Sequence, residues 1–289
     1  MASNGEGRGS LRRRVARVAR EAGAELVAVS YFDYETRTAW SYHGEEWFHA
    51  ASTIKLPVLV GVFGAIERGE LTLDSRVHVR NRFLSAVDGE AFRVGSGRDA
   101  NGAVYQALGK TLKVEALCFH MITTSSNLAT NLLLDVVGLA ALQRTLDELR
   151  LGGIELRRGV EDERAFEEGI NNLVTADGLV RLLRLIEEEK TFSREAAQKM
   201  LEILHQQAFN SGIPAGLPDD ARVAHKTGEI STVAHDTGLV YLPERKPYAL
   251  AILTRWDAET TAGRQATVAA ISREVYDCLA AGDEEASDE

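Results

Sequence analysis

The sequence predicts an α/β protein in which an antiparallel five-stranded sheet, flanked by helices from both termini, carries an all-helical lobe. Strand-like runs of β-branched and aromatic residues occur only near the ends of the chain, two before residue 50 and three after residue 220. Most of the chain between them has the apolar spacing of amphipathic helices. The runs from the two ends are therefore expected to share one sheet, with the middle of the chain packed against it.

Helices are predicted wherever apolar residues recur at three- and four-residue spacing. The first is rich in arginine, and the second is strongly apolar and ends at Gly69. In chain order the predicted helices span residues 11–24, 52–68, 114–123, 128–137, 139–150, 174–189, 193–207 and 263–281.

Strands are predicted where short runs of β-branched and aromatic residues are bounded by turn residues. In chain order they span residues 25–32, 36–42, 222–227, 232–241 and 248–254. The stretch 80–103 is rich in Gly, Asp and Arg, so we expect a long ordered loop there.

We expect two domains with a cleft between them. Residues 10–50 and 210–282 together form a discontinuous α/β sheet domain, and residues 51–209 form the helical domain. The polar segment 1–9 and the acidic segment 283–289 are expected to be disordered tails.

The composition excludes several classes of function. The 289 residues include 33 Lys and Arg against 43 Asp and Glu, a net charge of −10, whereas nucleic-acid-binding surfaces show a basic excess. No apolar run approaches the ~18 residues of a membrane span. The polar N-terminus lacks a signal-peptide core, which predicts a cytoplasmic protein as the sequence stands and an exported one if a leader was removed. The expected partner is a small-molecule substrate, and the oligomeric state is left open.

The cysteines and histidines do not indicate a metal or cofactor site. Cys118 and Cys278 form no CxxC pair, and the seven histidines include no HExxH spacing. We therefore predict no metal and no cofactor.

The first candidate for catalysis is Ser52-Thr53-Ile54-Lys55, at the start of the apolar helix. Lys55 lies one helical turn after Ser52, on the same face and within reach of its hydroxyl. A serine hydroxyl becomes a nucleophile when a neighbour takes its proton, and a partly desolvated lysine can do so. About one Ser-x-x-Lys occurs by chance in a chain of this size, so a serine that caps a helix is the alternative.

The second candidate is Ser125-Ser126-Asn127, which precedes another apolar helix. The Ser125 hydroxyl could relay a proton to a leaving group, and the Asn127 amide could bind a substrate carbonyl. By themselves, Ser and Asn at this place are also typical of a helix N-cap.

The third candidate is His225-Lys226-Thr227-Gly228, at the end of a predicted strand and followed by Glu229. Lys226 and Thr227 facing a cleft would form an anion site, and Gly228 would let a substrate approach the backbone. A charged edge strand that enters a turn is the alternative.

The order of the three motifs favours a common function. They occur at a helix start, an inter-helix turn and a late strand, and at these residues the chain resembles the class A β-lactamases and related penicillin-binding-protein-like serine hydrolases. The resemblance extends from about residue 11 to about residue 281. It implies the sheet-and-lobe fold of that family and a serine hydrolase without cofactor.

The resemblance also implies a catalytic role for four residues. Ser52 would be the acylated nucleophile, and Lys55 would accept or relay its proton. Ser125 would pass a proton to the departing lactam nitrogen, and Lys226 would lower the cost of the charge involved.

The same motifs would bind the substrate. Asn127 would hold its side-chain amide and Thr227 its carboxylate, next to Gly228, where the backbone comes close. The backbone N–H groups of Ser52 and Glu229 would form the oxyanion hole. An acidic side chain is unusual at this place, so we expect Glu229 to weaken the binding of carboxylated substrates.

Deacylation is where the chain departs from the family pattern. Class A enzymes activate the hydrolytic water with a glutamate in a Glu-x-x-x-Asn motif on an omega loop. Glu161 falls at the corresponding distance after Ser125, with Asp162 and Glu163 beside it, but none of the three has asparagine four residues on. An exposed acidic loop is the alternative reading. In the same way, Ser126 stands where class A enzymes usually have aspartate.

The sequence thus predicts a serine hydrolase that forms an acyl-enzyme at Ser52, with the β-lactam amide as the favoured substrate. The missing asparagine leaves open an esterase or peptidase on the same scaffold, or a slowly deacylating penicillin-binding or sensor protein. A metal-dependent lactamase is disfavoured by the histidine spacing.

Overall fold

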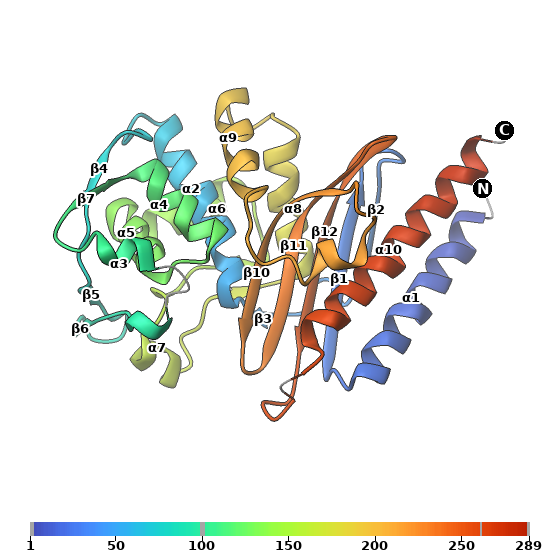
Figure 1. Cartoon of the computed structure of the whole chain (residues 1–289), viewed down its shortest axis with the longest axis horizontal. Coiled ribbons are helices and arrows are strands. Elements are labelled where there is room, and N and C mark those ends of the chain that lie inside the picture. Colours follow the sequence, from blue (N-terminus) through green and yellow to red (C-terminus); the bar gives the residue numbers. More distant parts are fainter. Residues whose placement is uncertain (1–2, 99–101, 261, 288–289) are drawn as a thin grey trace.

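A computed structural model describes residues 3–98, 102–260 and 262–287 of the chain (Figure 1). Its centre is a five-stranded antiparallel sheet in the order β10-β11-β12-β1-β2, with helices around it, which confirms the predicted fold class. In chain order the strands of this sheet are β1 (Leu26–Asp33), β2 (Thr38–Tyr42), β10 (Arg222–Ile230), β11 (Val233–Leu242) and β12 (Arg245–Arg255).

The two ends of the chain meet in this sheet. β1 lies between β2 and β12, so Val29 pairs with Tyr42 on one side and with Ile252 on the other. β12 pairs with β11, and β11 with β10, which makes β10 an edge strand. The edge strand lies against the 3-10 helix η1 (Ala51–Ile54), where the helical lobe begins.

One face of the sheet is covered by α1 (Ser3–Ala22) and α10 (Arg264–Ser287), which lie side by side (Figure 1). Their apolar residues, among them Val15 and Ile271, share a core with the sheet. Both helices continue through residues 3–9 and 283–287, where the sequence predicts disordered tails. The helices are longer than predicted because adding a residue to an existing helix costs far less free energy than nucleating a new one. The remaining tail residues lie outside the described ones.

The helical lobe packs against the other face. Its helices are α2 (Lys55–Glu67), α4 (Val114–Thr123), α5 (Asn127–Val137), α6 (Leu139–Glu148), α8 (Ala176–Glu187) and α9 (Arg194–Leu204). α2 is buried from Lys55 to Ala65, because it forms the centre of the lobe. At Gly61 an added Cβ would lie 2.0 Å from Leu142 Cδ2, so only glycine allows α2 to approach α6 this closely.

The lobe and the sheet share one apolar core. α8 packs against β1, β11 and β12, and Figure 1 shows it between the rest of the lobe and the sheet. The core contains Leu59 and Leu132 from the lobe together with Ala249 and Leu253 from β12. This continuous packing fixes the position of η1 relative to β10.

Several short elements were not predicted, because two to five residues are too few to show a periodicity. Within the stretch expected to be a loop, the structure has β5, β6 and η2. The short elements are β3 (Phe48–His49), β4 (Arg76–His78), β5 (Phe83–Leu84), β6 (Ala91–Phe92), η2 (Ser96–Arg98), α3 (Gly102–Gln106), β7 (Thr111–Lys113), β8 (Ile154–Glu155), α7 (Glu163–Glu167), β9 (Leu173–Val174) and η3 (Ile213–Gly216).

One of these small sheets supports the cleft. β3, β9 and β8 pair in the order β3-β9-β8, with His49 opposite Leu173 and Leu173 opposite Glu155. The pairing ties the segment just before Ser52 to both ends of the loop 156–172. That loop therefore starts and ends beside the N-terminus of η1.

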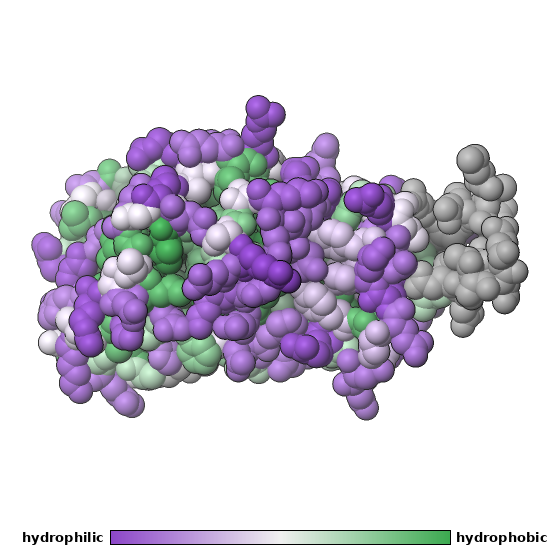
Figure 2. Space-filling model, turned by 90° about the horizontal axis from the view of Figure 1, so that it is seen from above, coloured by the Kyte–Doolittle hydropathy of each residue, from purple (hydrophilic) through white to green (hydrophobic). Residues whose placement is uncertain are grey.

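The surface seen from above is mainly hydrophilic, with apolar residues gathered toward the end that holds the lobe (Figure 2). Phe166 of α7 and Leu84 of β5 are among the exposed large apolar side chains. None of the helices within the described residues is long and apolar enough to cross a membrane.

Candidate active site

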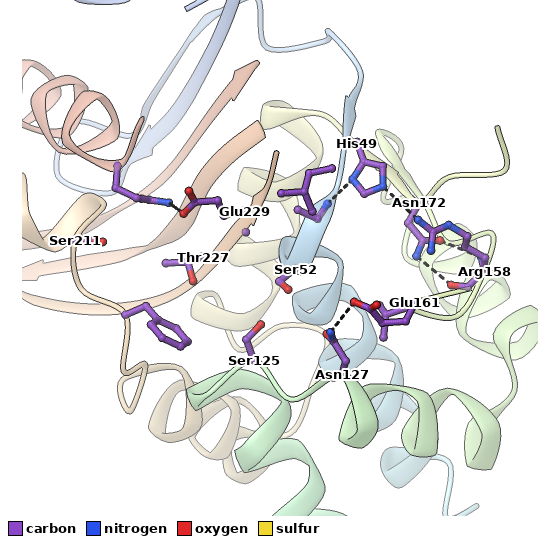
Figure 3. A pocket seen from close by; sticks show the side chains of 16 residues that line it. His49, Ser52, Ser125, Asn127, Arg158, Glu161, Asn172, Ser211, Thr227 and Glu229 are labelled. Carbon is purple, nitrogen blue, oxygen red and sulfur yellow. Dashed lines mark hydrogen bonds between the residues drawn. The ribbon is translucent and has the colours of Figure 1, made fainter. Parts of the chain in front are cut away.

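A cavity of about 490 Å³ opens where β10, η1, the turn between α4 and α5, and the loop 156–172 meet. Seven of the nine predicted site residues line it, and the other two, Lys55 and Lys226, are buried next to lining residues. The seven are Ser52, Ser125, Asn127, Glu161, Thr227, Gly228 and Glu229. Figure 3 shows Ser52 in the middle, Thr227 and Glu229 on one side, Glu161 on the other, and Ser125 and Asn127 across from them. Residues from four separate parts of the chain thus face one space.

Ser52 lies in the 3-10 turn that leads into α2. Pro57 is the third residue of α2, and its ring would clash with the carbonyl of Thr53 if the α-helix began a turn earlier. The chain therefore enters the helix through a 3-10 turn. Just before it, the Ala51 N–H donates to His49 Nδ1 at 3.0 Å, which fixes the entry to η1.

Lys55 joins the first two motifs. Its side chain has no exposed surface, and Nζ donates to Ser52 Oγ at 3.1 Å and to Ser125 Oγ at 3.0 Å. It also donates to the Ser125 carbonyl and to Asn127 Oδ1, both at 2.6 Å. The Lys55 ammonium thus has three protons and four oxygen acceptors around it. Because two of these acceptors are hydroxyls, protons can be exchanged between them through Nζ.

Asn127 connects Lys55 to Glu161. Its Oδ1 accepts from Lys55 Nζ, while its Nδ2 donates to Glu161 Oε1 at 3.0 Å, as the dashed line in Figure 3 shows. The amide is thereby fixed in orientation, because its oxygen faces an ammonium donor and its nitrogen faces a carboxylate. Glu161 is therefore held at the cavity wall, and the Asn127 side chain links it to Lys55.

The neighbours of Glu161 have other positions. Asp162 is buried, accepts from the Ala165 N–H as the N-cap of α7, and also accepts from Ser85 Oγ at 2.9 Å. Neither Asp162 nor Glu163 is among the residues that line the cavity. Of the three acidic residues that the sequence left open, the structure brings only Glu161 to Ser52.

The loop that carries Glu161 is held by a buried asparagine. Asn172 Oδ1 accepts from the N–H groups of Arg157 and Arg158, at 2.8 and 3.0 Å, and its Nδ2 donates to the Arg158 carbonyl. Arg158 itself donates to the Gly159 carbonyl and to Asn171 Oδ1. These bonds close the loop on itself at its base.

The third motif supplies the wall along β10. Lys226 is fully buried, its Nζ donates to the Thr227 carbonyl at 2.9 Å, and burial lowers the pKa of this amine to about 7. An added Cβ on Gly228 would lie 2.9 Å from the Thr53 nitrogen and 3.1 Å from that of Ser52. Glycine is therefore required for β10 to pass this close to the backbone of η1.

Three lining residues have backbone conformations that L-residues rarely adopt. Ala51, Ser125 and Glu161 have φ angles of 45°, 58° and 64°, in the left-handed region. Each such residue costs of the order of 1 kcal/mol and persists only where the surroundings enforce it. Strain at three separate segments around one cavity is typical of a functional site.

Residues that the sequence analysis did not single out complete the lining. They are His49, Ala51, Arg158, Val160, Asn172, Phe209, Ser211, Ile230 and Gln265. Burial lowers the pKa of His49 to about 4, so its ring is neutral at pH 7. Four lie in β3, η1, β10 and α10 and the other five in loops, and the sequence holds no motif that would have identified them.

The helix-cap reading of the second motif is correct for Ser126. Ser126 is buried and its Oγ accepts from the Ala129 N–H at 3.1 Å, as an N-cap of α5. Inside the sheet, the Asp236 carboxylate accepts from His225 Nδ1 at 2.9 Å. Among the described residues, no group of three or more His, Cys, Asp or Glu could hold a metal ion.

Known proteins are similar to this chain in sequence and in fold. The sequence model described as the beta-lactamase enzyme family matches residues 10–279. A beta-lactamase of Streptomyces albus G is 27% identical over 286 residues, which cover 96% of this chain and 88% of that protein. Beta-lactamase CARB-4 of Pseudomonas aeruginosa is 22% identical over 258 residues, which cover 87% of this chain and 84% of that protein.

Three solved structures extend the comparison. The structure of PBP-A has a TM-score of 0.80 and 25% identity, covering 93% of this chain and 96% of that chain. A variant of the last common ancestor of the class A beta-lactamases of Gram-negative bacteria has a TM-score of 0.81 and 25% identity, covering 94% of this chain and 99% of that chain. A mutant of PBP-A, 26% identical to this chain, was solved as an acyl-enzyme complex with penicillin G.

Proposed function

Because the chain belongs to the beta-lactamase enzyme family and is a serine β-lactamase-like hydrolase, we propose that it opens β-lactams through an acyl-enzyme on Ser52. The observation that carries the proposal is the position of Lys55 Nζ, within 3.1 Å of Ser52 Oγ and 3.0 Å of Ser125 Oγ. One amine that touches two hydroxyls can take a proton from one and return it through the other.

Acylation follows from these contacts. In the proposal, the Lys55 ammonium first releases one proton to solvent, and the neutral amine then takes the proton of Ser52 while Oγ bonds to the lactam carbonyl carbon. The negative charge on the carbonyl oxygen is stabilised by the backbone N–H groups of Ser52 and Glu229. As the carbonyl–nitrogen bond breaks, the proton passes from Lys55 through Ser125 Oγ to the lactam nitrogen. Lys226, buried next to Thr227, lowers the free-energy cost of the charge that develops in this transfer. Thr227 binds the substrate carboxylate, and Asn127 binds the side-chain amide of the substrate.

Deacylation requires a base on the opposite side of Ser52. Glu161 lines the same cavity and accepts from Asn127 Nδ2, which places a carboxylate across from β10. In the proposal, Glu161 takes a proton from a water as its oxygen attacks the ester, and this proton passes to Ser52 Oγ as the ester C–O bond breaks.

Intact-protein mass spectrometry after mixing with benzylpenicillin tests the acylation. The wild-type protein should gain the mass of one penicillin, and Ser52→Ala should gain none. Ser211→Ala is the matched control, because Ser211 is exposed in the same cavity but has no contact with Lys55 among those the structure shows. Loss of the adduct in both variants, or in neither, would contradict Ser52 as the nucleophile.

The lifetime of the adduct tests the role of Glu161. Glu161→Gln should still acylate but lose its adduct at least 100-fold more slowly, since a positioned general base contributes about 10²–10⁴-fold. Glu163→Gln, two residues away and outside the cavity, should keep the wild-type lifetime. Equal lifetimes in wild type and Glu161→Gln would remove Glu161 from deacylation.

A slowly deacylating penicillin-binding protein is the second candidate. Two observations favour it: Ala165 stands where the family motif has asparagine, and PBP-A has the same fold. In that case the wild-type adduct would persist as long as that of Glu161→Gln. If benzylpenicillin forms no adduct, esters and peptides are the substrates to test against Ser52.

A further inference from the structure

The β10 side of the cavity carries a negative charge. Glu229 lines the cavity, and its side chain is exposed. It follows Thr227 by two residues on β10, and side chains two apart on a strand project from the same face at a spacing of about 7 Å. The proposed function assigns the substrate carboxylate to Thr227. Glu229 therefore stands beside the place where a β-lactam acid would hold its own negative charge.

The Glu229 carboxylate is held in this position by α10. Gln265 Nε2 donates to Glu229 Oε2 at 3.0 Å, and both side chains line the cavity (the dashed bond beside Glu229 in Figure 3). A neutral amide donor orients the carboxylate without cancelling its charge, unlike a lysine or arginine partner. The charge is thus a fixed part of the cavity wall.

Basic side chains that line the cavity do not offset this charge. Of the described lining residues, only His49 and Arg158 are basic, and Figure 3 shows both on the side away from Glu229. His49 is neutral at pH 7, because burial lowers its pKa to about 4. Arg158 is engaged in the loop 156–172, where it donates to the Gly159 carbonyl and to Asn171.

Two basic residues lie behind the wall of β10. Lys226 is fully buried and donates to the Thr227 carbonyl, and burial lowers its pKa to about 7. Arg264 is 6% exposed, donates to the Ile230 carbonyl and does not line the cavity. The substrate on the cavity side therefore meets the carboxylate of Glu229 directly and these cations only through the strand.

We propose that Glu229, oriented by Gln265, gives this site a preference for the charge of the substrate group that lies beside Thr227. The site favours acyl donors in which this group is neutral or cationic over donors in which it is a carboxylate. The inference rests on the proposed acylation of Ser52. It ranks esters, amides and amine-bearing acyl donors above free β-lactam acids as substrates of the same site.

Benzylpenicillin and its methyl ester are the two probes, since they differ in the charge of this group and otherwise only by one methyl group. For each probe we measure the second-order rate constant of adduct formation. The ratio of the rate constant for the ester to that for the acid is then compared between variants. Glu229→Gln keeps the shape and the contact with Gln265. It should raise the rate with the acid roughly tenfold, as expected for two charges about 7 Å apart in a partly solvated site, and so lower the ester-to-acid ratio roughly tenfold.

A matched control separates local charge from net charge. Glu259→Gln removes one negative charge from an exposed residue outside the cavity, and the ester-to-acid ratio should stay at the wild-type value. In the wild type the ratio should fall when salt is raised from about 0.02 to about 0.5 M, because salt screens exposed charges, and it should be flat in Glu229→Gln. A ratio that Glu229→Gln leaves unchanged overturns the inference.

The charge preference also has a readout that needs no acylation. In the Ser52→Ala background, calorimetry should show benzylpenicillin binding about tenfold more tightly after Glu229→Gln is added. Equal affinities overturn the charge preference. If no adduct forms with either probe in the wild type while this shift is present, the proposed acylation fails and the charge preference stands.

Discussion

Lys55 is the residue on which the proposed chemistry depends, because its amine has four oxygen acceptors and no exposed surface. Burial of this amine would cost free energy if it were not hydrogen-bonded. Its neighbours come from two segments: Ser52, three residues before it, and the turn at Ser125 and Asn127, about 70 residues after it. A residue-scale change here should therefore affect activity before it affects the fold.

Lys55→Met is the substitution that tests this. Methionine has a similar length and no proton to exchange, so acylation by benzylpenicillin should slow by about 10³-fold while the protein remains folded. Stopped-flow mixing or timed mass spectrometry measures the rate, and circular dichroism checks the fold. Lys190→Met, at an exposed lysine far from Ser52 in the sequence, is the control and should acylate normally. A Lys55→Met rate within tenfold of wild type would mean that another group takes the proton.

The elements around the cavity are tied together by buried polar contacts. His235 of β11 donates from Nε2 to the His49 carbonyl of β3 at 3.0 Å and accepts from the Thr254 N–H of β12 at Nδ1, at 3.1 Å. Both ring nitrogens are used, so the neutral tautomer is specified. The residue links the large sheet to the small sheet that holds the loop 156–172.

This link predicts a dependence of stability on pH. Burial lowers the pKa of His235 from 6.5 to about 4, so below pH 6.5 the unfolded chain binds a proton that the folded chain does not. The contribution of His235 to stability is therefore complete above about pH 6.5 and is lost as the pH falls toward about 4. His235→Gln should remove up to about 1.4 kcal/mol per pH unit from this slope.

Urea unfolding at several pH values between about 7 and about 4.5 measures the effect. His78→Gln is the control, because His78 is exposed on β4 and should leave the slope unchanged. If His235→Gln and the wild type lose stability in parallel as the pH falls, the proton is taken up elsewhere.

At the scale of the whole molecule, the site exists because the helical lobe docks against an edge strand of the sheet. β10 contacts η1, and the space between them leaves no room for a methyl group at Gly228. The oxyanion hole of the proposed mechanism needs one N–H from each side of this contact, so the spacing of lobe and sheet sets the geometry of the reaction.

Gly228→Ala should push the two parts apart. The added Cβ would meet the backbone nitrogen of Thr53 at 2.9 Å, so acylation should fall at least tenfold and the free energy of unfolding by about 1–3 kcal/mol. Benzylpenicillin acylation and urea unfolding measure the two effects. Gly95→Ala is the matched control, because nothing lies within 4 Å of an added Cβ there, and it should change neither quantity. Acylation at the wild-type rate in Gly228→Ala would show that this spacing does not matter.

The sequence by itself determined the fold class and the order of the motifs. Both depend on local patterns: apolar periodicity identified the helices and strands, and the identities at Ser52, Lys55, Ser125 and Lys226 are visible without any structure. It did not locate the two-residue strands or the lining residues Phe209 and Gln265, because neither has a local pattern.

Only the tertiary structure decided which residues meet. It separated Glu161, bound to Asn127 at the cavity, from Asp162, buried as a helix cap, although the two are adjacent in the sequence. It also revealed the left-handed backbone at Ala51, Ser125 and Glu161. The physical reason is that these features are enforced by contacts between segments far apart in the chain. Such contacts depend on how whole elements pack, and short-range propensity does not encode them.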